Sequence, residues 1–233
     1  MQFIEKNSFN VRSAVYTLRK RGSGLEFLLF PMVHIGSRDY YSLVRDRLSK
    51  CDLILAEGVN SKRGRLLTYS YRVVRRIKRM DLATQQEALS LAGLKGKVVN
   101  ADMSGQSFDK SWSRFPLRMR VSILLLLPAY IIYLLMFGTR DLIAEHMSLE
   151  DLPSRDEVLN EDETSIRLDG LLVDERDKIL LDRITRLDEA AAGESKIVGV
   201  LFGAFHMRRV SALLRRQLGY TIVDSEWITV FDL

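Results

Sequence analysis

The stretch that decides the fold runs from Ile197 to Gly219 and reads IVGVLF-GAFH-MRRVSALLRRQL-G. Its first part is short and continuously apolar, which is typical of a strand that is buried on both faces of a sheet. Its second part, Met207–Leu218, has the pattern of a helix, and Gly219 stands where a glycine commonly ends one. A buried strand that leads into a helix is the repeating unit of α/β proteins. The stretch therefore predicts a largely parallel sheet covered by helices.

Segments of both kinds recur along the rest of the chain. Val11–Arg19 alternates and is joined by Arg-Gly-Ser-Gly to an apolar run, which predicts a β-hairpin. Ser37 can cap a helix that has its apolar residues on one face. The other expected elements are the apolar strands Leu25–Val33, Asp52–Ala56 and Lys97–Ala101, the helices Leu66–Met80, Thr84–Ala92 and Glu163–Ala192, and an extended segment over Tyr220–Phe231. We expect a single α/β domain over residues 1–233, with a mixed, largely parallel sheet flanked by helices.

Composition excludes several classes of protein. With 233 residues, 47% of them hydrophobic and 28% charged, the chain can bury a sizeable core and is not natively disordered. Cys51 is the single cysteine, which excludes an intrachain disulfide and a cysteine-based zinc finger. A net charge of +5 without a recognition motif does not indicate a nucleic-acid partner. The first residues lack the pattern of a signal peptide, so we expect a cytoplasmic location.

A polar residue follows each of the four apolar strands. The four are His34, Glu57, Asp102 and His206. Because the carboxyl ends of parallel strands meet at one edge of a sheet, these side chains are expected to lie close together, where open α/β sheets bind ligands. The alternative is that each is an ordinary cap, turn or packed side chain. By contrast, His146 lies outside any strand end and is expected to be a surface or helix residue.

Two imidazoles and two carboxylates form a ligand set for a divalent transition metal. His34, His206 and Glu57 are the candidate ligands, and Asp102 is a further ligand or a residue that orients one. A metal held this way keeps positions open for water and substrate, lowers the pKa of the bound water and polarises a carbonyl group. Glu57 is alternatively the general base of such a reaction.

Two blocks of sequence carry a resemblance to a known family. The first, PMVHIGSRDYYSLVRDRLSKCDLILAEG, has a strand ending in histidine, a helix, and a strand ending in an acid. The second has DERDKILLDRITRL before KIVGVLFGAFHMRRVSALLRRQLGY, in which a G-x-x-H motif follows a strand. These blocks resemble the TraB/PrgY/GumN superfamily, which includes the Tiki metalloproteases and, more distantly, erythromycin esterase-like and haem-binding ChaN-like proteins. Nothing between Gly105 and Asp174 corresponds to that pattern.

The resemblance implies roles for individual residues. His34, Glu57 and His206 match the family's proposed metal or catalytic positions, and Arg176 matches the arginine that precedes the second histidine motif. Arg176 would then hold a substrate carboxylate or a developing oxyanion; without the resemblance, a solvated charge or an ion pair is expected for it. The first G-x-x-H motif has Pro31 in place of its glycine. This departure bears on activity more than on the fold, because proline cannot adopt the backbone shapes open to glycine.

Two hypotheses for function follow. The first is a metal-dependent, peptidase-like hydrolase that acts on a peptide or small-molecule substrate at or near a membrane, with Glu57 and Arg176 as catalytic residues. The second is a non-catalytic binding or regulatory module, which would use the same edge of the sheet to hold a peptide, haem or a metal. The absence of glycine at position 31 favours the second hypothesis.

An apolar insertion over residues 112–140 points to a membrane. Its central part, Val121–Phe137, has no charged residue and contains Pro128. We expect contact with membrane lipid, supported by the basic helix Leu66–Met80; the alternative is a buried pair of helices divided by the proline. A single crossing through 121–137 would separate His34 and Glu57 from His206. A hairpin that enters and leaves the same side, turning at Pro128, would keep one site.

Overall fold

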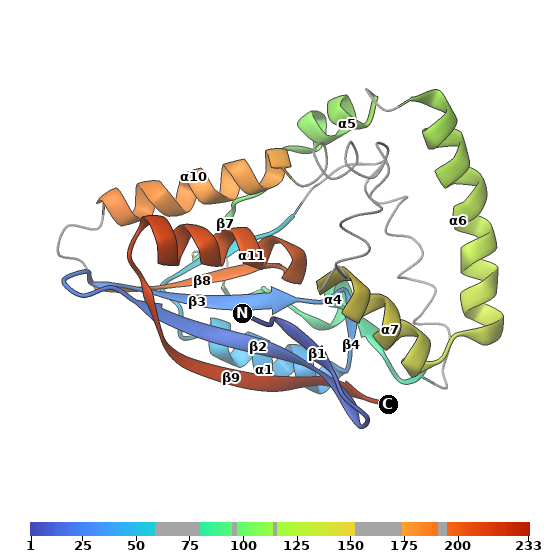
Figure 1. Ribbon diagram of the computed structural model, residues 1–233, viewed down its shortest axis with the longest axis horizontal. Coiled ribbons are helices and arrows are strands. Elements are labelled where there is room, and N and C mark those ends of the chain that lie inside the picture. Colours follow the sequence, from blue (N-terminus) through green and yellow to red (C-terminus); the bar gives the residue numbers. More distant parts are fainter. Residues whose placement is uncertain (59–79, 95–96, 114–115, 152–173, 191–194) are drawn as a thin grey trace.

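The computed structural model describes residues 1–58, 80–94, 97–113, 116–151, 174–190 and 195–233 (Figure 1). The expected basic helix Leu66–Met80 lies almost entirely outside these ranges, as does the first part of the helix expected over Glu163–Ala192. The described part of that second helix is α10 (Glu175–Ala190).

The main sheet has seven strands in the order β1-β2-β3-β8-β5-β7, with β9 paired to β2. Four consecutive strands, β3 (Leu25–Met32), β8 (Lys196–Gly203), β5 (Leu53–Ala56) and β7 (Val98–Asn100), pair in parallel. The other three, β1 (Ile4–Lys6), β2 (Asn10–Arg19) and β9 (Thr221–Asp232), pair antiparallel. The predicted hairpin and the mixed α/β fold are therefore confirmed. A separate two-stranded sheet joins β4 (Ile35–Gly36) to β6 (Ala83–Thr84).

Helices cover both faces of the parallel strands (Figure 1). On one face, α1 (Arg38–Leu48) buries four side chains: Tyr40, Tyr41, Val44 and Leu48. As expected, Ser37 caps this helix, because its side chain accepts a hydrogen bond from the Tyr40 N–H at 3.1 Å. On the other face, α10 and α11 (Ala204–Ala212) bury apolar side chains against alternate residues of the same strands.

Alternation along β8 separates the two cores. Val198, Val200 and Phe202 pack with α10 and α11, whereas Leu201 packs in the core that contains α1. Gly199 faces α1, where an added Cβ would lie 3.0 Å from Sγ of Cys51 and 3.3 Å from Cδ2 of Leu48, so a larger residue would have to displace these side chains. Buried side chains of this size each contribute about 1.5–3 kcal/mol, and the two faces together explain why the strand is apolar throughout.

The helix after β8 begins earlier than the sequence predicts. It starts at Ala204 rather than Met207, so His206 lies in the first turn of α11 instead of in a loop. Its last turn, η3 (Leu213–Gln217), is a π-helix, and Gly219 follows with φ 77°, as expected of a glycine that ends a helix. The helix expected over Thr84–Ala92 is a single turn, α4 (Gln85–Ala88).

The apolar insertion forms neither a hairpin nor a buried pair of helices, and both interpretations are wrong. After α5 (Gly105–Ser113), one continuous helix, α6 (Leu117–Phe137), contains Pro128 in its interior. The proline removes one backbone hydrogen bond, but the leucine and isoleucine residues on both sides favour the helix. Most of its large apolar side chains are exposed, so it is not a core element. Within the described ranges, no helix combines the length and apolarity needed to cross a membrane.

The C-terminal end of α6 is attached to the domain. Arg140, the first residue of α7 (Arg140–Asp151), donates hydrogen bonds to the backbone oxygens of Met80 at 2.8 Å and Asp232 at 2.9 Å. Asp141 also pairs with Lys6 of β1 at 3.6 Å. In Figure 1, α6 stands beyond the carboxyl ends of the parallel strands, at the end of the molecule farthest from the β2–β3 turn.

Candidate functional site

The carboxyl ends of the parallel strands bring together Glu57, Asp102 and His206. Glu57 directly follows β5, Asp102 lies just after β7, and Gly203 ends β8 and caps α11, which carries His206. His34, which follows β3, is exposed, and its backbone oxygen accepts a hydrogen bond from the Gln85 N–H at 2.9 Å. Because β3 runs parallel to β8, His34 also lies at the edge formed by the carboxyl ends of the strands.

Arg176 joins the two carboxylates at this edge. Its Nε and Nη2 atoms donate to Oδ1 and Oδ2 of Asp102 at 2.8 and 2.7 Å, which is the two-pronged geometry that suits a guanidinium group. Nη2 also donates to Oε1 of Glu57. The arginine comes from α10, so the helix that covers the sheet places a permanent positive charge between two strand ends. Of the two roles that the sequence allowed, an ion pair or a substrate contact, the first is observed.

Asp102 is occupied on all sides. Its side chain is fully buried. In addition to Arg176, it accepts hydrogen bonds from the backbone N–H groups of Met103 at 2.7 Å and Gly58 at 3.1 Å. Asn100 reinforces the same turn, because its side chain donates to the Gly58 carbonyl and accepts from the Asp102 N–H. Asp102 therefore holds Arg176 in position and has no lone pair directed at a ligand.

His206 is paired with a carboxylate that the sequence analysis did not single out. Nδ1 of His206 lies 2.5 Å from Oδ1 of Asp177, and both side chains are buried. The other oxygen of Asp177 forms an ion pair with Nη1 of Arg209 at 3.0 Å, although its geometry is not that of a hydrogen bond. Arg209 also contacts Asp174. In the neutral tautomer whose Nδ1 donates to this carboxylate, Nε2 carries the lone pair and lies on the side of Glu57.

A signal for Asp177 is present in the sequence. It lies on the same stripe of α10 as Leu180 and Ile184, and all three are buried. A carboxylate within the apolar stripe of an amphipathic helix is rare unless it is paired inside the protein. The position of Asp177 beside Arg176 in the E-R-D motif then indicates that the motif supplies two site residues from consecutive positions.

Glu57 is contacted by Arg176, by the Gly203 backbone and by His206. Its Oε2 accepts a hydrogen bond from the Gly203 N–H at 2.7 Å, and its Oε1 lies 3.9 Å from Nε2 of His206. Burial alone would raise the pKa of Glu57, but Arg176, then His206 and His34, and the Gly203 hydrogen bond outweigh it and lower that pKa to about 2. For Arg176, burial lowers the pKa, but Asp102 and Glu57 more than offset it, and the pKa is raised. Glu57 is therefore ionised at any physiological pH.

The arrangement fits a metal less closely than it fits a bound water. A metal with bonds of about 2.0–2.2 Å to Nε2 and Oε1 would hold these atoms about 3.0–3.5 Å apart, at octahedral or tetrahedral angles. The observed 3.9 Å is wider, and the guanidinium of Arg176 lies where an ion shared by Glu57 and Asp102 would lie. Among the described residues, no three His, Cys, Asp or Glu side chains form a group that could hold a metal ion. A water about 2.8 Å from each atom could donate to both.

The remaining predicted positions are also accounted for. Pro31 continues β3 opposite Phe202, and its carbonyl accepts hydrogen bonds from the Ser13 and Tyr40 hydroxyl groups, so the substituted motif position lies in a regular strand. His146 lies in α7, as expected of a helix residue, and its side chain is outside the described part.

No family model, curated protein or solved structure matches the chain. The resemblance to the TraB/PrgY/GumN superfamily therefore stays a prediction, and what the site does is argued from its geometry alone.

Proposed function

We propose that the protein is a hydrolase in which His206 and Glu57 together activate a water molecule. The observation that carries this proposal is the 3.9 Å separation between Nε2 of His206 and Oε1 of Glu57, which are both acceptors when the ring carries its proton on Nδ1. Two acceptors at this spacing suit a molecule that can donate two protons, and water is the simplest. The carboxylate orients the water, and the imidazole removes its proton.

The reaction would proceed in two steps. In the first, Nε2 of His206 takes a proton from the water while the oxygen forms a bond to the carbonyl carbon of an ester or amide. In the second, the bond to the leaving group breaks, and the same proton passes from Nε2 to the departing oxygen or nitrogen. Asp177 accepts the Nδ1 proton throughout, which fixes the ring orientation and stabilises the imidazolium that forms between the two steps.

The low pKa of Glu57 assigns its role. A carboxylate with a pKa of about 2 is a weak base near pH 7, so Glu57 orients water and stabilises positive charge rather than taking the proton. Arg176 keeps Glu57 ionised and holds it in position, and Asp102 in turn holds the guanidinium group of Arg176 in position. The substrate class is an ester or amide, which includes the peptide substrates expected from the sequence. We place the activity next to a membrane because α6 exposes a large apolar surface.

The test is an activity screen of the purified protein with chromogenic esters and fluorogenic peptides. We expect turnover that persists after treatment with a chelator, and that falls by about 10²–10⁴-fold in His206→Gln and Glu57→Gln. Asp182→Asn is the matched control, because this carboxylate is exposed on α10 and pairs with Arg186, and the variant should retain most activity. Loss of activity on chelation, with a stoichiometric metal that is absent from His34→Gln, would instead establish the metal-dependent mechanism.

A folded protein that turns over no ester or peptide would contradict the proposal and favour the binding module. Calorimetry with haem and with peptides would then test that second hypothesis. It has one specific observation in its favour, the proline at position 31 of the first histidine motif.

A further inference from the structure

The helix α6 exposes apolar side chains over most of its circumference. At about 100° per residue, the exposed ones cover an arc of about 220°. They are Leu117, Val121, Leu125, Leu126, Tyr130, Ile132, Tyr133, Leu135, Met136 and Phe137. On the opposite side, Leu134 is buried and Ile131 is half-buried. Large apolar side chains exposed this densely mark a contact surface.

The width of this arc distinguishes between possible partners. A helix that packs on a protein buries a stripe of somewhat over 100°, and α6 contacts its own domain on the side of Leu134, which is buried, and Ile131, which is half-buried. A second stripe for another protein would leave much of the remaining arc exposed. A lipid phase, in contrast, surrounds whatever part of a helix enters it. The arc therefore fits lipid better than it fits a groove on a protein partner.

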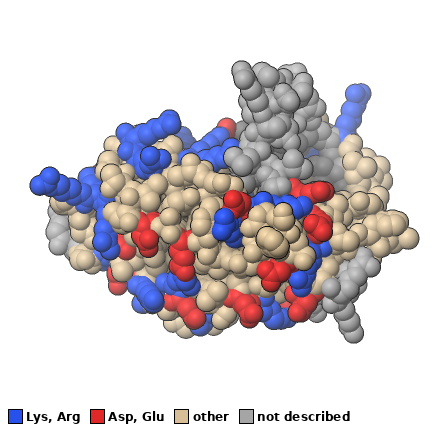
Figure 2. All heavy atoms as spheres, turned by 60° about the horizontal axis from the view of Figure 1, so that its bottom comes forward, with Lys and Arg blue, Asp and Glu red and all other residues tan. Residues whose placement is uncertain are grey.

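The charges around α6 agree with a lipid partner. Between Leu117 and Arg140 the chain has three arginines and no acidic residue. Arg118 is exposed in the first turn of the helix, while the guanidinium of Arg140 is held by backbone carbonyls at the other end. Figure 2 shows charges of both signs across the body of the molecule, whereas the end at which α6 lies is largely uncharged. Arginine beside an apolar helix suits anionic headgroups.

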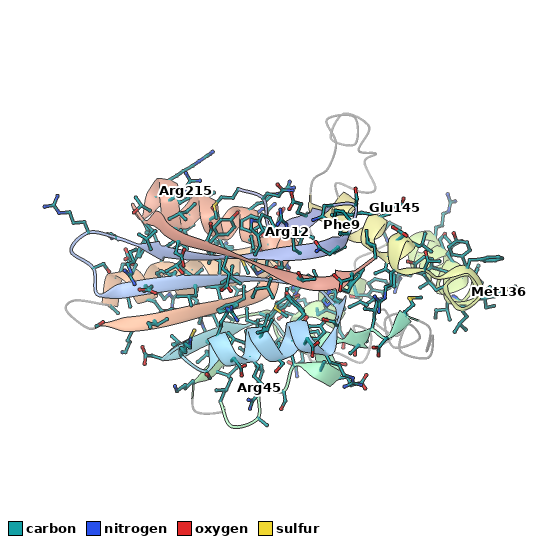
Figure 3. All side chains as sticks on the ribbon, turned by 90° about the horizontal axis from the view of Figure 1, so that it is seen from below. Phe9, Arg12, Arg45, Met136, Glu145 and Arg215 are labelled. Carbon is teal, nitrogen blue, oxygen red and sulfur yellow. The ribbon has the colours of Figure 1, made fainter. Side chains whose placement is uncertain are left out.

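We infer that α6 binds the surface of an anionic phospholipid bilayer, with its exposed arc in the interfacial region and without crossing it. Helices of this kind bury their apolar side about 5–10 Å below the headgroups. Figure 3 shows Met136 at the end of the molecule that α6 forms, away from the sheet, which would be the deepest part. This inference specifies the membrane location proposed above but does not rest on the hydrolytic chemistry.

Flotation with vesicles tests the inference without any substrate. We expect wild-type protein to float with vesicles of phosphatidylcholine and phosphatidylglycerol, and less with phosphatidylcholine alone. The double variant Leu125→Asp/Met136→Asp changes residues that are 70% and 63% exposed. It should lower the partition coefficient from solution onto vesicles by at least about a hundredfold. The control is Phe9→Asp in the turn between β1 and β2, where the side chain is 78% exposed, and it should float like wild type.

A label at a single site gives an independent readout. Cys51 is the only cysteine and is buried, so Met136→Cys can be labelled selectively with an environment-sensitive dye. Its emission should rise and shift to the blue on anionic vesicles, and the emission of a label at Phe9→Cys should not. No flotation of wild type, equal flotation of the double variant, or an unchanged label at position 136 would each overturn the inference.

Sedimentation velocity without lipid separates lipid binding from self-association. We expect wild type and Leu125→Asp/Met136→Asp to sediment alike. A wild-type dimer that the double variant abolishes would overturn the assignment to lipid and identify α6 as a contact between two copies of the chain. Because none of these measurements involves turnover, an inactive protein that still floats would refute the proposed hydrolase and leave this inference intact.

Discussion

The site at the strand ends and the helix α6 differ from the usual pattern, in which charged side chains are exposed and apolar ones are buried, and they differ from it in opposite ways. At the site, Arg176, Asp102 and Asp177 are charged groups held inside the protein, and each is paired there. Along α6, leucine, isoleucine and phenylalanine are left outside it. The first departure costs desolvation energy that the pairing offsets, and the second leaves apolar surface in water. Each therefore marks a region shaped by something other than the stability of this domain.

The largest expected effect separates the buried ion pairs from an exposed one on the same helix. Arg176→Ala leaves Asp102 buried without its partner and should lower the free energy of unfolding by about 3–5 kcal/mol. Arg186→Ala on α10 removes an exposed pair with Asp182 and should cost no more than about 0.5 kcal/mol. Urea unfolding of both variants measures the difference. Equal losses would show that the site arginine is only a surface charge.

The second effect uses pH to test the electrostatics around Glu57. Its pKa is lowered from 4.5 to about 2, so the folded protein binds the proton less tightly than the unfolded chain does. The resulting stability is present above about pH 4.5 and is lost as the pH falls toward about 2, and it amounts to about 3 kcal/mol. Glu57→Gln should flatten this part of the pH dependence. If wild type and variant lose stability in parallel between about pH 5 and 2.5, the Glu57 carboxylate is not held by its neighbours as described.

Adjacent leucines of α6 sharpen the contrast within one element. Leu134 is buried against the domain and Leu135 is exposed. Leu134→Ala should lower stability by about 2 kcal/mol because it leaves a cavity, whereas Leu135→Ala should change it by less than about 0.5 kcal/mol. Thermal unfolding of the two variants provides the measurement. A similar loss in both would mean that α6 is covered on all sides.

The smallest expected effect lies on the exposed arc of α6. Leu125→Asp/Met136→Asp should leave the free energy of unfolding within about 0.5 kcal/mol of wild type, because both side chains are mostly exposed. Chemical denaturation in solution checks this, and it makes the same variant usable on vesicles. A loss of several kcal/mol would assign the arc to the stability of the domain.

The positions of Glu57, Asp102 and His206 could be predicted from the sequence, but Asp177 and the pairing of these groups could not. Apolar strands that end just before Glu57 and a few residues before His206 were enough to place both side chains at one edge, because parallel strands share a direction. Arg176 contacts Asp102 across 74 residues of chain, and the register of α10 on the sheet decides which oxygens it reaches. Without knowledge of that register, the sequence cannot distinguish a set of four metal ligands from a network of ion pairs.

For α6 the sequence identified an apolar segment but suggested the wrong shape. A proline inside a helix costs about 3 kcal/mol, which favoured a break at Pro128. The helix continues because it loses one backbone hydrogen bond at Pro128, whereas most of its 21 residues favour the helix and together offset that loss. Whether such a helix is buried depends on what surrounds it, and that information lies in tertiary packing rather than in the composition of the segment.

The strand order has a consequence for how the chain folds during synthesis. β8 lies between β3 and β5, so the parallel core stays incomplete until residue 203 has left the ribosome. The ion pair between Glu57 and Arg176 cannot form until Arg176, which is 119 residues later in the chain, has been synthesised. α6 is made between them, and its own hydrogen bonds are local and fast to form. The nascent chain therefore presents a finished apolar helix well before it has a folded domain, and chaperones or a lipid surface would meet that helix first.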